Sequence, residues 1–135
     1  MLLAHPGGPF WSRRDAGAWS IPKGEYLDDE LAEVAAKREF VEELGLPVPD
    51  GDLIPLGEAR QKSGKLVTAW ALEADLDPEV IVPGMFSMEW PKNSGAFQEI
   101  PEIDRVQWFT IGEARERITA GQQAFLDRLV ELLQD

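Results

Sequence analysis

Three glutamates and one arginine are crowded into a short stretch of the sequence, at Arg38, Glu39, Glu42 and Glu43. In a helix, with about 100° of rotation per residue, these glutamates fall within an arc of roughly 100°. Like charges at such spacings destabilise a helix by about 0.2–0.5 kcal/mol per pair. A hard divalent cation, Mg²⁺ or Mn²⁺, binds oxygen ligands and would remove the repulsion that one arginine leaves. The alternative is a solvated acidic helix face.

The sequence around the glutamates predicts the helix that would carry them. From about Asp28 to Leu44 the chain lacks glycine and proline and is rich in Glu, Ala and Leu, which favours a helix. Gly45 suits the position just after the helix end, and Pro47 prevents the helix from continuing. The glutamates would therefore lie in the C-terminal half of one helix.

The segment from Gly24 to Leu46, GEYLDDELAEVAAKREFVEELGL, resembles the Nudix box. A chance match in a chain of this size is on the order of 10⁻⁶ at average residue frequencies. Phe40 stands where the family usually has an aliphatic residue. The seven fixed letters of the box match at Gly24, Glu30, Arg38, Glu39, Glu42, Glu43 and Gly45.

The resemblance implies a hydrolase that cuts a phosphoanhydride bond in a nucleoside diphosphate linked to another group. Divalent ions in such a site neutralise and orient the polyanion and lower the pKa of the attacking water. By position, Glu39 and Glu43 would be direct metal ligands. Glu42 would be a ligand directly or through water, and the backbone oxygen of Lys23 a further one. Arg38 would orient the glutamates.

The identity of the general base is open. Glu43 or Glu39 of the box is one choice, and a glutamate from a later loop is the other. Glu102 stands six residues before Trp108, a spacing similar to that of the loop glutamate in family members that cleave dinucleoside polyphosphates. Glu99 and Glu89 are its rivals.

Candidate substrate contacts lie outside the helix. Arg13 and Arg14 follow Trp11 in a loop near the active site in sequence, and they are our first choice for phosphate contacts, together with Lys23. Trp90 is our choice for stacking on a base, a contact worth about 1–3 kcal/mol in single-strand nucleic-acid binders. The weaker candidates are Arg105 for phosphate and Trp11 and Phe97 for a base. Trp19 is also a stacking candidate, but we expect it to pack in the core. The flanking Lys62 and Lys65 are interpreted as solubilising charges, and His5, the single histidine, as structural.

The remaining pattern mixes strands and helices and predicts an α/β (α+β) fold, which the resemblance refines to a Nudix-type α/β/α sandwich around a mixed sheet. We expect one domain over residues 1–135. Residues 66–72 (LVTAWAL) are almost wholly apolar and predict a strand buried on both faces, whereas residues 83–104 show no clear period. The other expected strands are residues 2–5, 18–21, 53–62, 65–75 and 106–109. Residues 53–62 and 65–75 are expected to form a hairpin, joined at Ser63-Gly64. The expected helices are one opened by a Thr110–Glu113 capping box and one at residues 122–133.

The composition excludes several classes of function. The net charge of −12 argues against binding to bulk nucleic acid or an anionic membrane, and no apolar run approaches the roughly 20 residues of a membrane span. Cysteine is absent, so thiolate sites are excluded and a cytoplasmic location is expected. Compared with the family, the first N-terminal strand is expected to be lacking. The resulting sheet edge leaves open a homodimer formed by strand pairing.

The first substrate prediction is a dinucleoside polyphosphate such as diadenosine tetraphosphate. Residues 19–25 (WSIPKGE) resemble the strand and loop that lead into the box in the dinucleoside-polyphosphate and NTP pyrophosphohydrolase branch. NTP or ADP-ribose pyrophosphatase activity is the alternative. An alternative of another class is a non-catalytic Nudix-fold module that binds a nucleotide or a protein. Such modules usually lose box glutamates, and all of them are present here.

Overall fold

The computed structural model describes residues 1–22, 30–61 and 63–134. The expectations for Lys23, Gly24, Asp28 and Lys62 lie outside these residues. In chain order the elements are β1 (Leu2–Pro6), α1 (Ala32–Leu44), β2 (Ile54–Arg60), β3 (Leu66–Ala71), η1 (Pro78–Val80), β4 (Met85–Glu89), β5 (Phe97–Pro101), β6 (Ile103–Trp108), α2 (Ile111–Arg117), η2 (Ala120–Gln122) and α3 (Gln123–Leu133).

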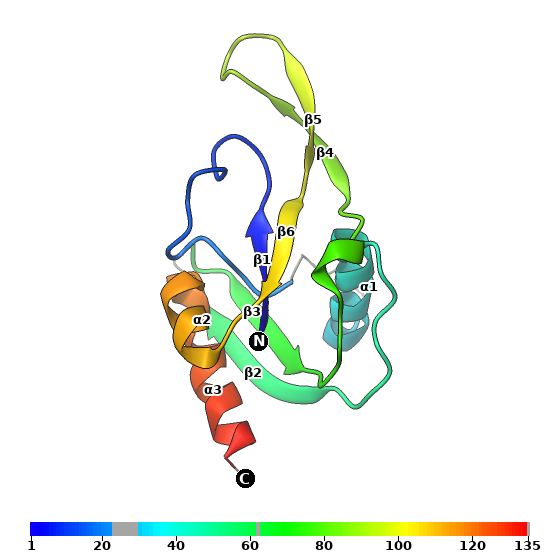
Figure 1. Ribbon diagram of the computed structural model, residues 1–135, viewed down its shortest axis with the longest axis vertical. Helices are drawn as coiled ribbons and strands as arrows, with labels where there is room; N and C mark the ends of the chain where they lie inside the picture. The colour runs from blue at the N-terminus through cyan, green and yellow to red at the C-terminus, as the bar shows by residue number, and fades with distance from the viewer. Residues whose placement is uncertain (23–29, 62, 135) are drawn as a thin grey trace.

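The strands form antiparallel pairs: β1 with β6, β2 with β3, and β4 with β5. The β1–β6 pair lies between α1 on one side and α2 and α3 on the other (Figure 1). The β4–β5 hairpin and the loop after β1 both extend from the same end of the molecule. The α+β content expected from the sequence is confirmed. None of the helices in the described residues is long and apolar enough to cross a membrane.

The glutamate helix α1 ends where the sequence predicts. Gly45 adopts φ 68°, and its N–H donates to the Val41 carbonyl at 2.8 Å. A left-handed residue at this position favours glycine, and a side chain there would also overlap the Val82 carbonyl. The helix begins at Ala32, later than the expected start near residue 28, and Leu31 provides no side-chain cap.

Three further expectations are confirmed. The strands β2 and β3 form a hairpin that turns at Gly64, whose φ is 88°. Thr110 and Glu113 form the capping box of α2. The helix α3 packs Phe125 and Leu126 into the core, although Leu133 at its end is exposed.

Two expectations about strands are corrected. Residues 83–104 are not irregular, because they contain the β4–β5 hairpin. Most side chains on both of its faces are exposed, Phe97 and Phe86 among them, so no hydrophobic alternation marks these strands. The strand expected at residues 18–21 is reduced to two isolated bridges, Ala4 with Ser20 and Trp19 with Ile118.

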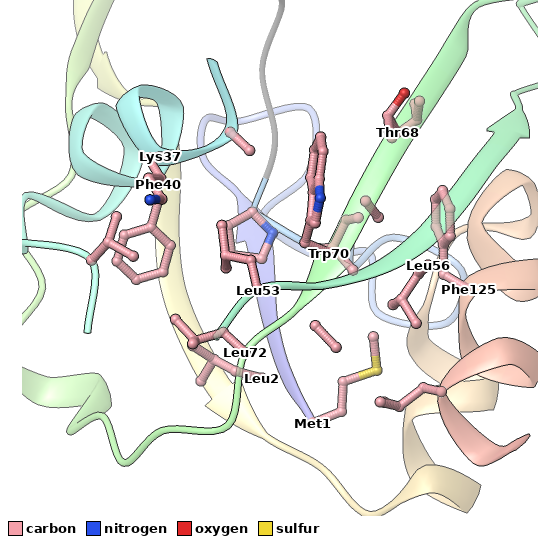
Figure 2. Close-up of a pocket in the computed structure, with 18 of the residues that line it drawn as sticks. Met1, Leu2, Lys37, Phe40, Leu53, Leu56, Thr68, Trp70, Leu72 and Phe125 are labelled. Atoms are coloured by element: carbon pink, nitrogen blue, oxygen red, sulfur yellow. The ribbon is translucent and has the colours of Figure 1, made fainter. Parts of the chain in front are cut away.

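The prediction that residues 66–72 are buried on both faces is wrong. Only Ala69 of β3 is buried, and Leu66 is 48% exposed. The physical reason is an apolar cavity of about 810 Å³ between the β2–β3 hairpin, α1 and the start of β1. Figure 2 shows the side chains of Met1, Trp70 and Leu72 around this space. The apolar side chains of β3 line a cavity instead of packing in a core.

Candidate active site

Arg38 lies at the centre of the acidic face of α1. Its Nε and Nη2 atoms donate to the two carboxylate oxygens of Glu30, at 2.8 and 2.9 Å. Its Nη1 atom lies 2.9 Å from a Glu39 oxygen and 3.2 Å from both Glu42 oxygens. The hydrogen bonds that Arg38 donates to Glu30, then those to Glu42, raise the pKa of Arg38 above its already high ordinary value. One permanent cation therefore holds three carboxylates.

The last box glutamate, Glu43, is half-buried and directly follows Glu42 in α1. Across residues 1–22, 30–61 and 63–134, no three acidic or histidine side chains are arranged closely enough to hold a metal ion together. Arg38 Nη1 instead bridges Glu39 and Glu42. A metal ion at this face would share these two carboxylates with the guanidinium, which sets their direction.

Glu102, from the turn between β5 and β6, is brought to the same face. Its backbone N–H donates to the Gly84 carbonyl at 2.8 Å, and the Gly84 N–H donates to the Glu42 carbonyl at 3.2 Å. Burial raises the pKa of Glu102, and repulsion from Glu39 and Glu42 adds to the effect. Three carboxylates from two distant segments therefore share one electrostatic environment.

The rival glutamates lie on the projecting β4–β5 hairpin. Glu89 accepts a hydrogen bond from the Asn93 backbone N–H at 2.7 Å near the hairpin tip. Glu99 is exposed opposite Ser87 in the β4–β5 register. Glu102, in contrast, lies beside α1, where burial, then repulsion from Glu39 and Glu42, raises its pKa.

The loop after β1 carries Arg13 and Arg14, and it starts beside Glu102. The Gly7 N–H donates to the Glu102 carbonyl at 3.2 Å, and a side chain at Gly7 would overlap the Pro101 carbonyl. Both arginines are exposed. The Arg14 guanidinium carbon lies 4.3 Å above the centre of the Phe10 ring.

The aromatic candidates fall into different environments. Trp19 is 1% exposed, and its indole N–H donates to Asp15 at 2.8 Å, so it belongs to the core and is not available to stack on a base. Trp90 is half-buried in the turn of the β4–β5 hairpin, where its backbone N–H donates to the Ala96 carbonyl. Phe97 is exposed at the start of β5. Arg105 lies over the Trp19 ring, with 5.1 Å between its guanidinium carbon and the ring centre.

The sequence reasoning missed the partners of His5. The ring is fully buried, with Nδ1 3.0 Å from an Asp104 oxygen and Nε2 2.7 Å from the Arg14 carbonyl. The sequence predicts a structural role for His5 but names neither of these partners. Asp104 is 99 residues away in sequence, and no motif spacing connects the two residues.

A family model, the NUDIX domain, matches residues 1–129. The chain belongs to the Nudix family.

Two solved structures show the same Nudix fold. The MutT protein from Methanosarcina mazei Go1 aligns with a TM-score of 0.60 at 19% identity, over 99% of this chain and 85% of that one. The E. coli ORF135 protein aligns with a TM-score of 0.58 at 24% identity, over 98% and 80% of the two chains. No curated protein matches the sequence. This Nudix protein is thus a pyrophosphohydrolase by family, and Nudix enzymes act on small nucleotide substrates with divalent cations such as Mg²⁺.

The acidic face of this Nudix hydrolase has the chemistry that a hard cation requires. Its donors are carboxylate oxygens, which Mg²⁺ and Mn²⁺ prefer. Burial raises the pKa of Glu102, and repulsion from Glu39 and Glu42 adds to the effect. The donor types on this face therefore suit a divalent ion, although the present spacing of the described side chains does not enclose one.

Proposed function

We propose that this Nudix hydrolase uses Mg²⁺ to cut a phosphoanhydride bond in a nucleoside diphosphate linked to another group, with a dinucleoside polyphosphate as the first substrate. The observation that carries the proposal is the meeting of Glu39 and Glu42, both held by Arg38, with Glu102 from another part of the chain. Repulsion among these carboxylates is relieved by a divalent cation, which a polyphosphate substrate also needs.

Glu39, Glu42 and Glu43 would hold the metal, and the Lys23 carbonyl is a further proposed ligand from the family motif. The bound ion supplies charge neutralisation, substrate orientation and a lowered pKa of water. Arg38 fixes the direction of the Glu39 and Glu42 carboxylates through its contacts with both. Residues that orient metal ligands typically contribute about 10- to 100-fold to metal affinity or activity.

Glu102 is the proposed general base. A base acts best when its pKa lies closer to the working pH than that of a free carboxylate, and burial next to Glu39 and Glu42 raises the pKa of Glu102 in that direction. Its carbonyl and N–H are both tied to neighbouring backbone, so the position of its main chain is fixed. Glu43 remains the alternative base within α1.

The proposed phosphate contacts are Arg13 and Arg14, with Lys23 as a third, and the proposed base-stacking residue is Trp90. The loop from Gly7 to Gly17, which we call the arginine loop, begins with a bond from the Gly7 N–H to the Glu102 carbonyl. The Glu102 N–H is connected through Gly84 to α1. The backbone of Glu102 is therefore bonded on one side to the start of the arginine loop and on the other, through Gly84, to the acidic helix. This arrangement supports a substrate with several phosphates, one part at the acidic face and another at the arginine loop.

A phosphate-release screen with Mg²⁺ over dinucleoside polyphosphates, nucleoside triphosphates and ADP-ribose tests the function. We expect turnover, with dinucleoside polyphosphates preferred, and loss of turnover in Glu43→Gln with an unchanged circular dichroism spectrum. Glu33→Gln on the exposed side of α1 is the matched control, because Glu33 pairs only loosely with Lys37, at 4.0 Å. Nucleotide binding without turnover in the wild type would favour the non-catalytic binding module instead.

A further inference from the structure

The buried His5 connects three segments that meet beside the proposed active site. It lies on β1, opposite Arg105 of β6 in the strand register. Its Nδ1 atom faces the Asp104 carboxylate, at 3.0 and 3.1 Å from the two oxygens, and its Nε2 atom faces the Arg14 carbonyl at 2.7 Å. The ring itself is 0% exposed, so water does not provide alternative partners for it.

The hydrogen-bond geometry decides the protonation of the ring. An ionised carboxylate and a backbone carbonyl are both acceptors only, and a neutral imidazole has one donor and one acceptor nitrogen. Two acceptors on opposite sides of the ring are therefore satisfied together only when both nitrogens carry protons. The Asp104 side chain is 31% exposed and supplies the negative charge that balances this imidazolium.

The other groups packed against His5 have defined roles. The Trp19 ring lies edge-on to it, with ring centres 5.0 Å apart. Arg105 stacks on Trp19 and opposes a positive charge on His5, whereas Asp15, which accepts from the Trp19 indole and pairs with Arg117, favours it. Asp104 is the charged group in direct contact with the imidazole, and the attraction between the two is charge-assisted.

The bond to the Arg14 carbonyl fixes the arginine loop in the middle. At the start of this loop the Gly7 N–H donates to the Glu102 carbonyl. At its end the Gly17 N–H donates to the Glu116 carbonyl. Between these anchors, Arg13 and Arg14 are exposed, and the side chain of His5 is the buried group that bonds the backbone of Arg14. If the proton on Nε2 is lost, a lone pair faces the carbonyl and the contact becomes repulsive.

We propose that His5 is a positioning residue: as an imidazolium balanced by Asp104, it holds the backbone of Arg14 so that the loop presents its two guanidinium groups to the phosphates of the substrate. The premise, that His5 is an imidazolium bonded to Arg14, rests on the hydrogen-bond geometry. The consequence, that the loop binds phosphate, rests on the proposed function. Deprotonation of His5 releases the loop and weakens phosphate binding, while the acidic face of α1 is unaffected.

The premise is tested by NMR of the side-chain nitrogens in the ¹⁵N-labelled full chain. The sequence has one histidine, so the imidazole signals need no assignment. At about pH 6, close to the ordinary titration range of histidine, we expect both nitrogens at imidazolium positions, and Asp104→Asn to move the loss of the second proton to lower pH. A neutral ring with one protonated nitrogen at that pH would overturn the proposal, whether or not the protein is an enzyme.

Two substitutions separate the two hydrogen bonds. His5→Gln places its amide nitrogen near the position of Nε2 and retains the bond to the Arg14 carbonyl, whereas His5→Asn places it near Nδ1 and retains only the bond to Asp104. We expect faster amide hydrogen exchange over residues 8–16 in His5→Asn than in His5→Gln. A purely structural His5 would give the same exchange in both variants, and this outcome would overturn the proposal.

The consequence is measured by calorimetric binding of inorganic pyrophosphate with Mg²⁺. We expect affinity about tenfold weaker in His5→Asn, as for loss of one hydrogen bond involving a charged group, and near wild-type affinity in His5→Gln. Equal affinities in wild type and both folded variants would overturn the proposal. If the wild type itself binds no pyrophosphate while NMR shows the imidazolium and exchange shows the loop contact, the failure lies with the proposed function.

Discussion

Arg38 and Glu30 form a two-pronged ion pair across eight residues, with both carboxylate oxygens accepting at 2.8 and 2.9 Å. The planar guanidinium matches a carboxylate in this geometry, which lysine cannot reproduce. Because Nε and Nη2 are engaged by Glu30, Nη1 is directed toward Glu39 and Glu42. The segment before α1 therefore sets the orientation of the proposed metal ligands through one arginine.

Arg38→Lys is expected to weaken Mn²⁺ binding by about 10- to 100-fold, the usual effect of removing a group that orients metal ligands. Electron paramagnetic resonance of free Mn²⁺ measures the affinity directly. Glu33→Gln, which changes the charge on the exposed side of the same helix, should bind Mn²⁺ as the wild type does. Equal Mn²⁺ affinity in Arg38→Lys and the wild type would show that Arg38 does not orient the ligands.

Glu102→Gln is expected to lower kcat by at least about 100-fold, within the usual contribution of a general base, with little change in KM. Glu99→Gln on β5 is the matched control, since Glu99 is exposed on the hairpin, and it should retain activity. In the wild type, kcat falls as the pH drops through the pKa of Glu102, which lies above that of an ordinary glutamate. A variant at Glu99 that loses more activity than the one at Glu102 would reverse the assignment.

The same raised pKa has a consequence for stability. Folding places the ionised Glu102 in a less favourable environment than the unfolded chain does, because burial and the neighbouring Glu39 and Glu42 disfavour its charge. The penalty applies above the pKa of the folded state and disappears as the pH falls below the ordinary glutamate pKa. Glu102→Gln should therefore raise the melting temperature at pH 7 while lowering kcat, and a lower melting temperature would contradict this account.

The sequence predicts which residue types form the site better than it predicts which distant segments meet there. The spacing of Glu39, Glu42 and Glu43 on one helix is a local property, so it is readable without a fold. Glu102 is singled out by its spacing from Trp108, but the backbone bonds through Gly84 that connect it to α1 are not visible in the sequence. The His5–Asp104 pair is likewise created by the register of β1 on β6, and for that reason the partner of His5 was missed.

The fold is predicted where local signals are strong. The Thr110–Glu113 cap and the left-handed Gly45 each follow from the residue types that such positions require. The β4–β5 hairpin was missed because both of its faces are mostly exposed, which removes the alternation used to recognise a strand. The prediction for residues 66–72 is wrong because an apolar segment indicates that its side chains avoid water, but not which other residues pack against them. In this chain they line a cavity.

Thr110→Ala is expected to destabilise the protein by about 1 kcal/mol at pH 7, the usual cost of losing an N-terminal cap. The Thr110 backbone N–H and hydroxyl both donate to Glu113, at 3.0 and 2.9 Å, and lower its pKa. The stabilisation that the ionised Glu113 contributes is present above the ordinary glutamate pKa. It is lost as the pH falls through the lowered pKa of Glu113 in the folded protein. Urea unfolding of wild type and Glu113→Gln should therefore differ at pH 7 and converge in acid, and a constant difference would exclude this linkage.

Ala71→Val is expected to stabilise the protein by about 1 kcal/mol, because the added methyl groups enter the cavity of about 810 Å³ and remove apolar surface from water. Valine is also favoured over alanine in strands, and Ala59→Val in the paired strand β2 controls for this effect, because Ala59 lies outside the cavity wall. Urea unfolding should show the larger gain at Ala71. If both substitutions stabilise equally, strand propensity alone explains the result, and burial of the added methyl groups in the cavity contributes nothing.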